Sequence, residues 1–169
     1  PGEYVYVRDL GRAYMDLGRR KDAVAVWRSL LSGDEKTATM YGQVAKMEQE
    51  AGLYDEAIET LRAGTGFKET GEFYSREIVR LERVVGREED AFRDALLLIG
   101  QRQGALESEI RDVTDIFKES KKRERLVALL DSMTAAGGDR SGIFVTLKTI
   151  FLVEAERYED ARKPLFGAG

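Results

Sequence analysis

Carboxylates are the residues of this chain best able to do chemistry. The sequence has 31 Asp and Glu residues but no His and no Cys, which removes the usual general base near neutral pH, thiolate nucleophiles and the commonest zinc ligands. Neighbouring acids such as Glu107 and Glu109, or Glu88, Glu89 and Asp90, are typical of solvated helix faces, and nothing beside them indicates the dry cleft that a general acid needs. We therefore expect no catalytic residue, no metal site and no cofactor.

Three arginines, Arg76, Arg80 and Arg83, follow the i, i+4, i+7 spacing of one helix face. A cationic face of this kind attracts carboxylates and phosphates. The alternative is an ordinary solvated face, because three acids stand close enough in the sequence to pair with these arginines: Glu72, Glu77 and Glu82. Both interpretations stay open at this point.

The elements that position such faces are expected to be helices. Pro occurs only at Pro1 and Pro164, so nothing between these two positions forbids continuous helix. A net charge of −4 argues against a chain that wraps nucleic acid. The apolar run 143–153 is interrupted by polar residues and is too short to cross a bilayer. The sequence thus predicts an all-α protein with no nucleic-acid partner and no membrane insertion.

A short pattern returns along the chain at a fixed interval. It reads GRRKDA at 18–23, GLYDEA at 52–57 and GREEDA at 86–91, with weaker versions at 120–125 and 156–161. Its glycine stands where one helix ends and a left-handed residue is required, its acid favours the first turn of the next helix, and its alanine lets two helices approach closely. In the fourth version Arg125 replaces the alanine. The pattern predicts five units, each with two helices around a tight turn.

The first unit carries Leu10-Gly11, Tyr14, Gly18, Ala23 and Trp27, and it resembles the tetratricopeptide repeat. The second and third units share this resemblance through Tyr41, Val44, Ala45, Gly52, Tyr54, Ala57 and Leu61, and through Ile78, Gly86, Ala91 and Leu98. No unit has the terminal proline of that family. The resemblance covers about the whole chain and is strongest up to residue 99. It implies a right-handed α-solenoid of antiparallel helix pairs, with about ten helices in a single domain over 1–169.

The expected units are 4–36, 37–70, 71–104, 105–140 and 141–169. Within them the pattern predicts helices at 4–17, 20–32, 37–51, 54–63, 71–85, 88–101, 107–119, 123–136, 142–155 and 158–166. The segment 143–153 is apolar almost all round, which fits either a helix covered by a neighbour or a buried strand. We expect the helix.

The resemblance also implies that the first helix of each unit lines a concave groove for a partner. The family's groove positions, carried over one unit at a time, are rich in cations in the N-terminal half and mainly apolar in the C-terminal half. We select as groove residues Arg8, Arg12, Lys46, Phe73, Arg76, Arg80, Arg83, Ile110 and Phe117. Such a groove suits a protein or an acidic peptide that carries hydrophobic anchors.

We therefore expect a non-catalytic scaffold that binds a peptide or a partner domain in its groove. One alternative is a structural spacer or a module that self-associates through the solenoid ends. Another is an accessory scaffold of an envelope or polysaccharide-export machine. The sequence begins without an initiator Met, and we expect a fragment of a longer protein. The cellular compartment stays open: a soluble cytoplasmic protein is the default, and a periplasmic or extracellular one is compatible with the absence of Cys.

Overall fold

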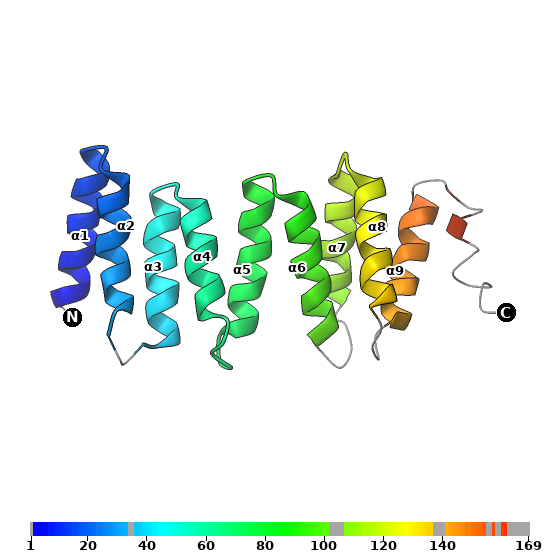
Figure 1. Cartoon of the computed structure of the whole chain (residues 1–169), viewed down its shortest axis with the longest axis horizontal. Helices are drawn as coiled ribbons and strands as arrows, with labels where there is room; N and C mark the ends of the chain where they lie inside the picture. Colours follow the sequence, from blue (N-terminus) through cyan, green and yellow to red (C-terminus); the bar gives the residue numbers. More distant parts are fainter. Residues whose placement is uncertain are drawn as a thin grey trace. The chain divides into compact units, whose positions relative to one another are not determined.

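A computed structural model describes residues 2–33, 36–101, 107–136, 141–154, 157 and 160–161. Within these ranges all the regular structure is helical (Figure 1). The elements are α1 (Gly2–Asp16), α2 (Arg20–Arg28), the short 3-10 helix η1 (Ser29–Leu31), α3 (Ala38–Glu50), α4 (Tyr54–Gly64), α5 (Gly71–Val84), α6 (Glu88–Gln101), α7 (Glu107–Glu119), α8 (Arg123–Ala135) and α9 (Ser141–Glu154). The all-α prediction is confirmed, and 143–153 lies within helix α9.

The helix limits follow the predicted repeat closely. Nine of the ten expected helices are present in the described ranges, and the tenth, expected at 158–166, lies mostly outside them. Helices joined by turns of about three residues lie side by side as pairs, α1 with α2 and α3 with α4. The chain is thus a tetratricopeptide-like helical repeat, while the handedness of the array stays a prediction.

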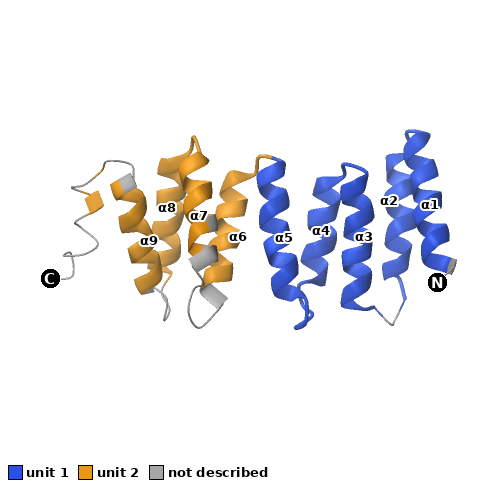
Figure 2. Ribbon diagram, turned by 180° about the vertical axis from the view of Figure 1, so that it is seen from behind, with its two compact units in different colours: residues 1–85 blue, residues 86–169 orange. Residues whose placement is uncertain are grey.

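The chain divides into two compact units, residues 1–85 with α1–α5 and residues 86–169 with α6–α9 (Figure 2). In the first unit α2 packs on α3, and α4 packs on α5. Two clusters of buried side chains fill these contacts. One surrounds Trp27, Ala23 and Met47, and the other surrounds Leu61, Tyr74 and Leu81.

The three predicted turn glycines have the expected backbone. Their φ angles are 70° at Gly18, 74° at Gly52 and 76° at Gly86. At the first turn Gly18 N–H donates to the Met15 carbonyl (2.9 Å), and Arg19 N–H donates to the Tyr14 carbonyl (2.8 Å). The same pair of bonds closes the turn at Gly52. This arrangement satisfies the last carbonyls of a helix and requires a left-handed residue.

We expect Gly18→Ala and Gly52→Ala each to lower the free energy of unfolding by about 1 kcal/mol, because an L side chain is strained at positive φ. Gly33→Ala is the matched control: a Cβ there meets nothing within 4 Å, and the φ of Gly33 is not in the left-handed region. Urea unfolding followed by circular dichroism measures all three. Equal costs at the three positions would contradict the conformational explanation.

In the second unit the aromatic side chains set the packing. Phe117 of α7 stacks on Phe151 of α9, with ring centroids 4.2 Å apart, and Phe92 of α6 lies 5.7 Å from the same ring. Arg125, which replaces the repeat's alanine, is exposed, whereas Leu126 is fully buried like its equivalents Ile58 and Phe92. The fourth unit therefore keeps a helix pair but lacks the buried alanine of the first three.

Candidate binding site

The predicted basic half of the groove lies entirely on the first unit. Arg8 and Arg12 are on α1, Lys46 is on α3, and α5 carries the remaining four residues, Phe73, Arg76, Arg80 and Arg83. Phe73 is 67% exposed, and Arg12, Lys46, Arg80 and Arg83 are also exposed. The helices α1, α3 and α5 thus place these side chains at the surface, as partner binding would require.

Most of these cations already have an acidic neighbour. Arg12 Nη2 lies 2.8 Å from Glu50 Oε2 and joins α1 to α3. Arg80 binds Glu77 on its own helix through two contacts of 2.8 and 2.5 Å, and it donates to Gln49 of α3 at 2.9 Å. Arg76 pairs with Glu72 at 3.1 Å, and Arg8 pairs with Asp9 at 2.8 Å. A ligand must therefore compete with these carboxylates.

Two of the carboxylates that pair with the arginines, Glu77 and Asp9, have lowered pKa values. The hydrogen bond from Arg80 keeps the pKa of Glu77 below its ordinary value, and the bond from Arg8 does the same to the pKa of Asp9. Ion pairs as exposed to solvent as these contribute little to stability. An incoming carboxylate can replace such a partner at little cost.

A hollow opens between α1 and α3, and one of the selected groove residues, Arg12, lines it. Trp27 and Met47, both nearly fully buried, and the half-buried Met15 supply its apolar lining. The polar lining is Arg12, Asp16 and Glu50, with Ala51 beside them. Of the selected groove residues Arg12 lies here, whereas Trp27 and Met47 stand at core positions of the repeat and were not selected.

The two groove residues selected in the second unit behave differently. Ile110 is half-buried on α7. Phe117 is only 1% exposed, because its ring stacks on Phe151 in the interior of that unit. Phe117 therefore belongs to the core and offers no surface to a partner.

Two ion pairs between successive helix pairs, each with a buried glutamate and a partly exposed arginine, were not predicted. Arg28 of α2 donates to Glu48 of α3 at 2.9 Å, and Arg62 of α4 donates to Glu82 of α5 at 2.6 Å. Glu48 and Glu82 are 0% and 1% exposed. Each arginine precedes its glutamate by 20 residues, and the second pair follows the first by 34. This recurrence is the signal in the sequence that could have revealed them.

Two glutamates of the first unit carry pKa shifts of opposite sign. Burial raises the pKa of Glu48 above its ordinary value of 4.5, and Arg28 offsets only part of this effect. Partial burial also acts to raise the pKa of Glu56, but the two-pronged contact from Arg20, at 2.8 and 2.9 Å, brings the pKa below 4.5 overall. The buried Glu48 touches no solvent, so its raised pKa does not mark a catalytic acid.

These shifts predict opposite pH dependences. A lowered pKa gives stability that is present above about pH 4.5 and is lost as the pH falls through the folded-state pKa of Glu56. A raised pKa makes stability fall as the pH rises from about 4.5 through the folded-state pKa of Glu48. We expect the stability of wild type relative to Glu56→Gln to grow from pH 3 to pH 7, and that relative to Glu48→Gln to shrink. Urea unfolding across this range measures both, and two parallel curves would contradict the assignment.

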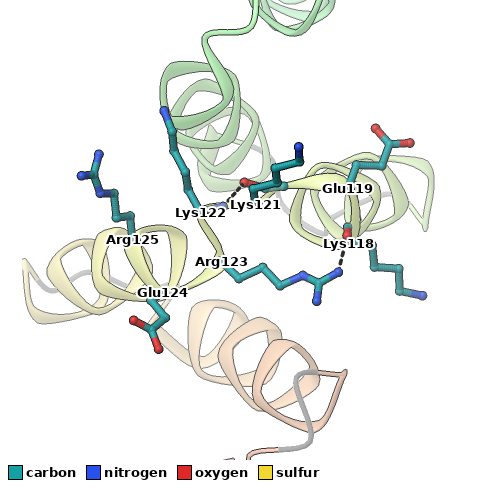
Figure 3. Close-up of a pocket in the computed structure, with 8 residues that line it drawn as sticks. Lys118, Glu119, Lys121, Lys122, Arg123, Glu124 and Arg125 are labelled. Atoms are coloured by element: carbon teal, nitrogen blue, oxygen red, sulfur yellow. Dashed lines mark hydrogen bonds between the residues drawn. The ribbon is translucent and has the colours of Figure 1, made fainter.

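The turn between α7 and α8 forms a second, more strongly basic hollow (Figure 3). Five of the eight residues at 118–125 are Lys or Arg, where the repeat pattern predicts only a weaker copy of its turn. Lys122 and Arg125 share the carboxylate of Glu89, at 3.7 and 3.3 Å, and Arg123 donates to the carbonyls of Phe117 and Lys118. Lys122 and Arg125 extend to one side of the turn, whereas Arg123 and Lys118 lie on the other side (Figure 3). No single small anion would be enclosed by all of them.

Two other features are absent from the described residues. Within that part of the chain, no three Asp or Glu side chains gather closely enough to hold a metal ion. No helix there combines the length and the apolar character needed to cross a bilayer.

Comparison with known proteins finds similarity at the level of structure. No protein-family model matches the sequence, and no curated protein matches it. A crystal structure of MamA is 12% identical, with 91% of this chain and 89% of that chain covered and a TM-score of 0.47. A putative kinesin light chain from Podosopora anserina, with nearly identical TPR-like repeats, is 13% identical, covers 95% and 90% of the two chains, and has a TM-score of 0.44. A single-substitution variant of that kinesin light chain is 12% identical over the same shares, with a TM-score of 0.45. Likenesses at this level carry no information on what this chain binds.

Proposed function

We propose that the first unit is a non-catalytic scaffold that holds a segment of another protein on the face formed by α1, α3 and α5. The observation that carries this proposal is the hollow between α1 and α3, where an apolar lining stands beside charged side chains. Specific protein recognition commonly combines a buried apolar anchor with a polar rim.

The lining of the hollow suits an apolar anchor. Met15 and Met47 are unbranched thioethers that can adjust to different side chains, and Trp27 gives them a rigid aromatic neighbour. An aliphatic or aromatic side chain of the partner would displace water chiefly from Met15, because Trp27 and Met47 are already nearly fully buried. Burial of the partner's own apolar surface is the main source of affinity in the proposal.

The rim of the hollow suits an acidic residue close to that anchor. Arg12 and Glu50 are 55% and 46% exposed, so their ion pair is easily exchanged. A partner carboxylate would replace Glu50 on Arg12, and a second could replace Glu77 on Arg80. The preferred partner is therefore a segment with one hydrophobic anchor and neighbouring acids.

Peptides selected from a random displayed library on the wild-type protein test this proposal. We expect the selected peptides to be rich in acids beside an apolar residue, and to lose about tenfold in affinity to Arg12→Glu combined with Arg80→Glu. The loss should shrink as the salt concentration rises, because these charges are exposed.

Lys21→Glu with Lys36→Glu is the matched control, since it changes the net charge equally at exposed positions outside the hollow. The control should bind the selected peptides like wild type. Equal binding to both double variants, or selection of peptides without acids and apolar residues, would overturn the proposal.

A further inference from the structure

One apolar stripe recurs on the first helices of three successive repeats. On α5 it consists of Tyr74, Ile78, Leu81 and Val85, which follow the i, i+4, i+7, i+11 spacing of a single helix face. The equivalent residues 34 positions earlier are Met40, Val44, Met47 and Ala51. Those a further 34 positions earlier, on α1 and just after it, are Tyr6, Leu10, Ala13 and Leu17. All twelve residues are apolar or aromatic.

The stripe of α5 is covered by the preceding helix pair, α3–α4. Ile78 and Leu81 are 2% and 0% exposed, and Val85 packs against their cluster. The Tyr74 hydroxyl donates to the Ala38 carbonyl and accepts from Gly42 N–H at 3.1 Å. A Cβ at Gly42 would lie 2.8 Å from this hydroxyl, so a glycine there makes room for the tyrosine.

The stripe of α3 is covered in the same manner by α1–α2. Val44 and Met47 are 0% and 3% exposed, in one cluster with Trp27 and Ala23. Ala51 packs against that cluster. On two helices out of three, therefore, the stripe is the surface on which one repeat stacks upon the previous one.

The stripe of α1 is the exception. Tyr6, the equivalent of Tyr74, is 66% exposed, and Leu17, the equivalent of Val85, is 71% exposed. Ala13 is also exposed, although its equivalents Met47 and Leu81 are buried. The outward face of a terminal repeat is normally polar, because it meets water. The stripe of α1 instead has the composition of an inner face.

We propose that the stripe of α1 is a stacking surface for a further helix pair of this same repeat, joined in tandem and seated as α3–α4 is seated on α5. Tyr6 then packs as Tyr74 does. The further helix pair supplies a small residue equivalent to Gly42 beneath the ring and a carbonyl equivalent to that of Ala38 for the hydroxyl. Tyr14 stands where Glu48 and Glu82 stand in the other two repeats. The helix pair that fits here needs no arginine equivalent to Arg28 and Arg62, because there is no buried glutamate for it to pair with.

An extended chain tests this proposal directly. Residues 37–70 are placed ahead of Glu3, so that Tyr6 follows the added pair at the spacing that Tyr74 keeps from α3–α4. We expect the midpoint of urea unfolding to rise by about 1 M, because nearest-neighbour interfaces add stability in repeat arrays. Tyr6→Ala should lower the midpoint of the extended chain and leave that of the 169-residue chain nearly unchanged.

Phe73→Ala is the matched control for the loss of an exposed aromatic, since Phe73 is 67% exposed and lies off the stripe. It should lower the midpoint of urea unfolding slightly, and by the same amount in the extended chain and in the 169-residue chain. A second extended chain carries an extra copy of residues 3–36 ahead of Glu3 and serves as a backup if the first one misfolds. In this chain the added helix pair offers α1 the same surface on which α3 packs.

Two results would overturn the proposal. One is that neither extended chain gains stability, or that Tyr6→Ala has the same effect with and without the added pair. The other is a dimer of the 169-residue chain in sedimentation that Leu17→Glu dissociates, since a second copy would then occupy the stripe. The hollow between α1 and α3 uses other residues of α1, so neither result bears on the proposed binding of a protein segment.

Discussion

Replacing Arg28 by leucine is expected to lower the free energy of unfolding by about 3 kcal/mol, because it leaves Glu48 buried without a counter-charge. Glu48 is 0% exposed, and its Oε2 already has no hydrogen-bond partner among the described residues. The expected cost lies at the lower end for broken buried pairs, because the Arg28 side chain is itself 34% exposed. Urea unfolding followed by circular dichroism measures it.

The substitution of the partner residue, Glu48→Ile, is expected to cost only about 1 kcal/mol. Arg28 would keep its contacts with the Glu56 carbonyl at 3.0 Å and the Glu59 carboxylate at 3.2 Å, and it would still reach water. The two halves of one ion pair thus differ in cost, since only one of them is sealed from solvent.

The double variant Arg28→Leu with Glu48→Ile copies what the chain itself does two repeats later. The residues 34 positions after Arg62 and Glu82 are Leu96 and Ile116, which are 0% and 3% exposed in the second unit. We expect the free energy of unfolding of this double variant to be at most about 1 kcal/mol below that of wild type, or higher. Replacing a buried ion pair by apolar residues often has this result. Simple addition of the two single costs would contradict this account.

Gly11→Ala is expected to have a comparable effect, a loss of about 3 kcal/mol from overpacking. A Cβ at Gly11 would lie 1.9 Å from Trp27 Nε1 and 2.3 Å from Cε2 of the same ring. The indole cannot easily move aside, because it is 1% exposed and its Nε1 donates to the Arg8 carbonyl at 3.2 Å. Gly33→Ala, where the added Cβ meets nothing within 4 Å, should be nearly neutral.

The next repeat suggests the compensating change. Ala45 and Leu61 stand 34 positions after Gly11 and Trp27, and both are buried in one cluster. In the second repeat the first helix thus has the larger residue, Ala45 in place of Gly11, and the second helix has the smaller one, Leu61 in place of Trp27. We expect Trp27→Leu to recover part of the stability lost in Gly11→Ala, although it is destabilising alone. If the two costs add without recovery, the clash with the indole is not the cause.

The helices and turns of the chain were predictable because their determinants are local. Gly18, Gly52 and Gly86 require only a backbone with positive φ at a helix end, and all three have it. The acids Asp22, Glu56 and Asp90 lie in the first turn of the second helices, as the helix dipole favours. The turns between paired helices that these residues predict are therefore where the structure has them over the described ranges.

The candidate site was predictable only in part. Repeat positions placed Arg12, Arg80 and their neighbours on the surface of the first unit, but they carried no information on pairing partners. The neutralising contacts with Glu50 and Glu77 depend on side-chain reach and on the approach of separate helices. Phe117 fell in the core for a similar reason: an aromatic ring at a groove position gains more by stacking on Phe151 than by facing water.

By itself, then, the sequence determined that the chain folds into helix pairs at 34-residue intervals, because spacing, glycine and small residues act within a few turns of the chain. Only the tertiary structure decided which polar groups become buried pairs, which face of α1 is left uncovered, and where a hollow forms. Arg28 and Glu48 lie 20 residues apart, and Tyr74 meets a carbonyl 36 residues away. Contacts over such separations exist only after the helices have packed.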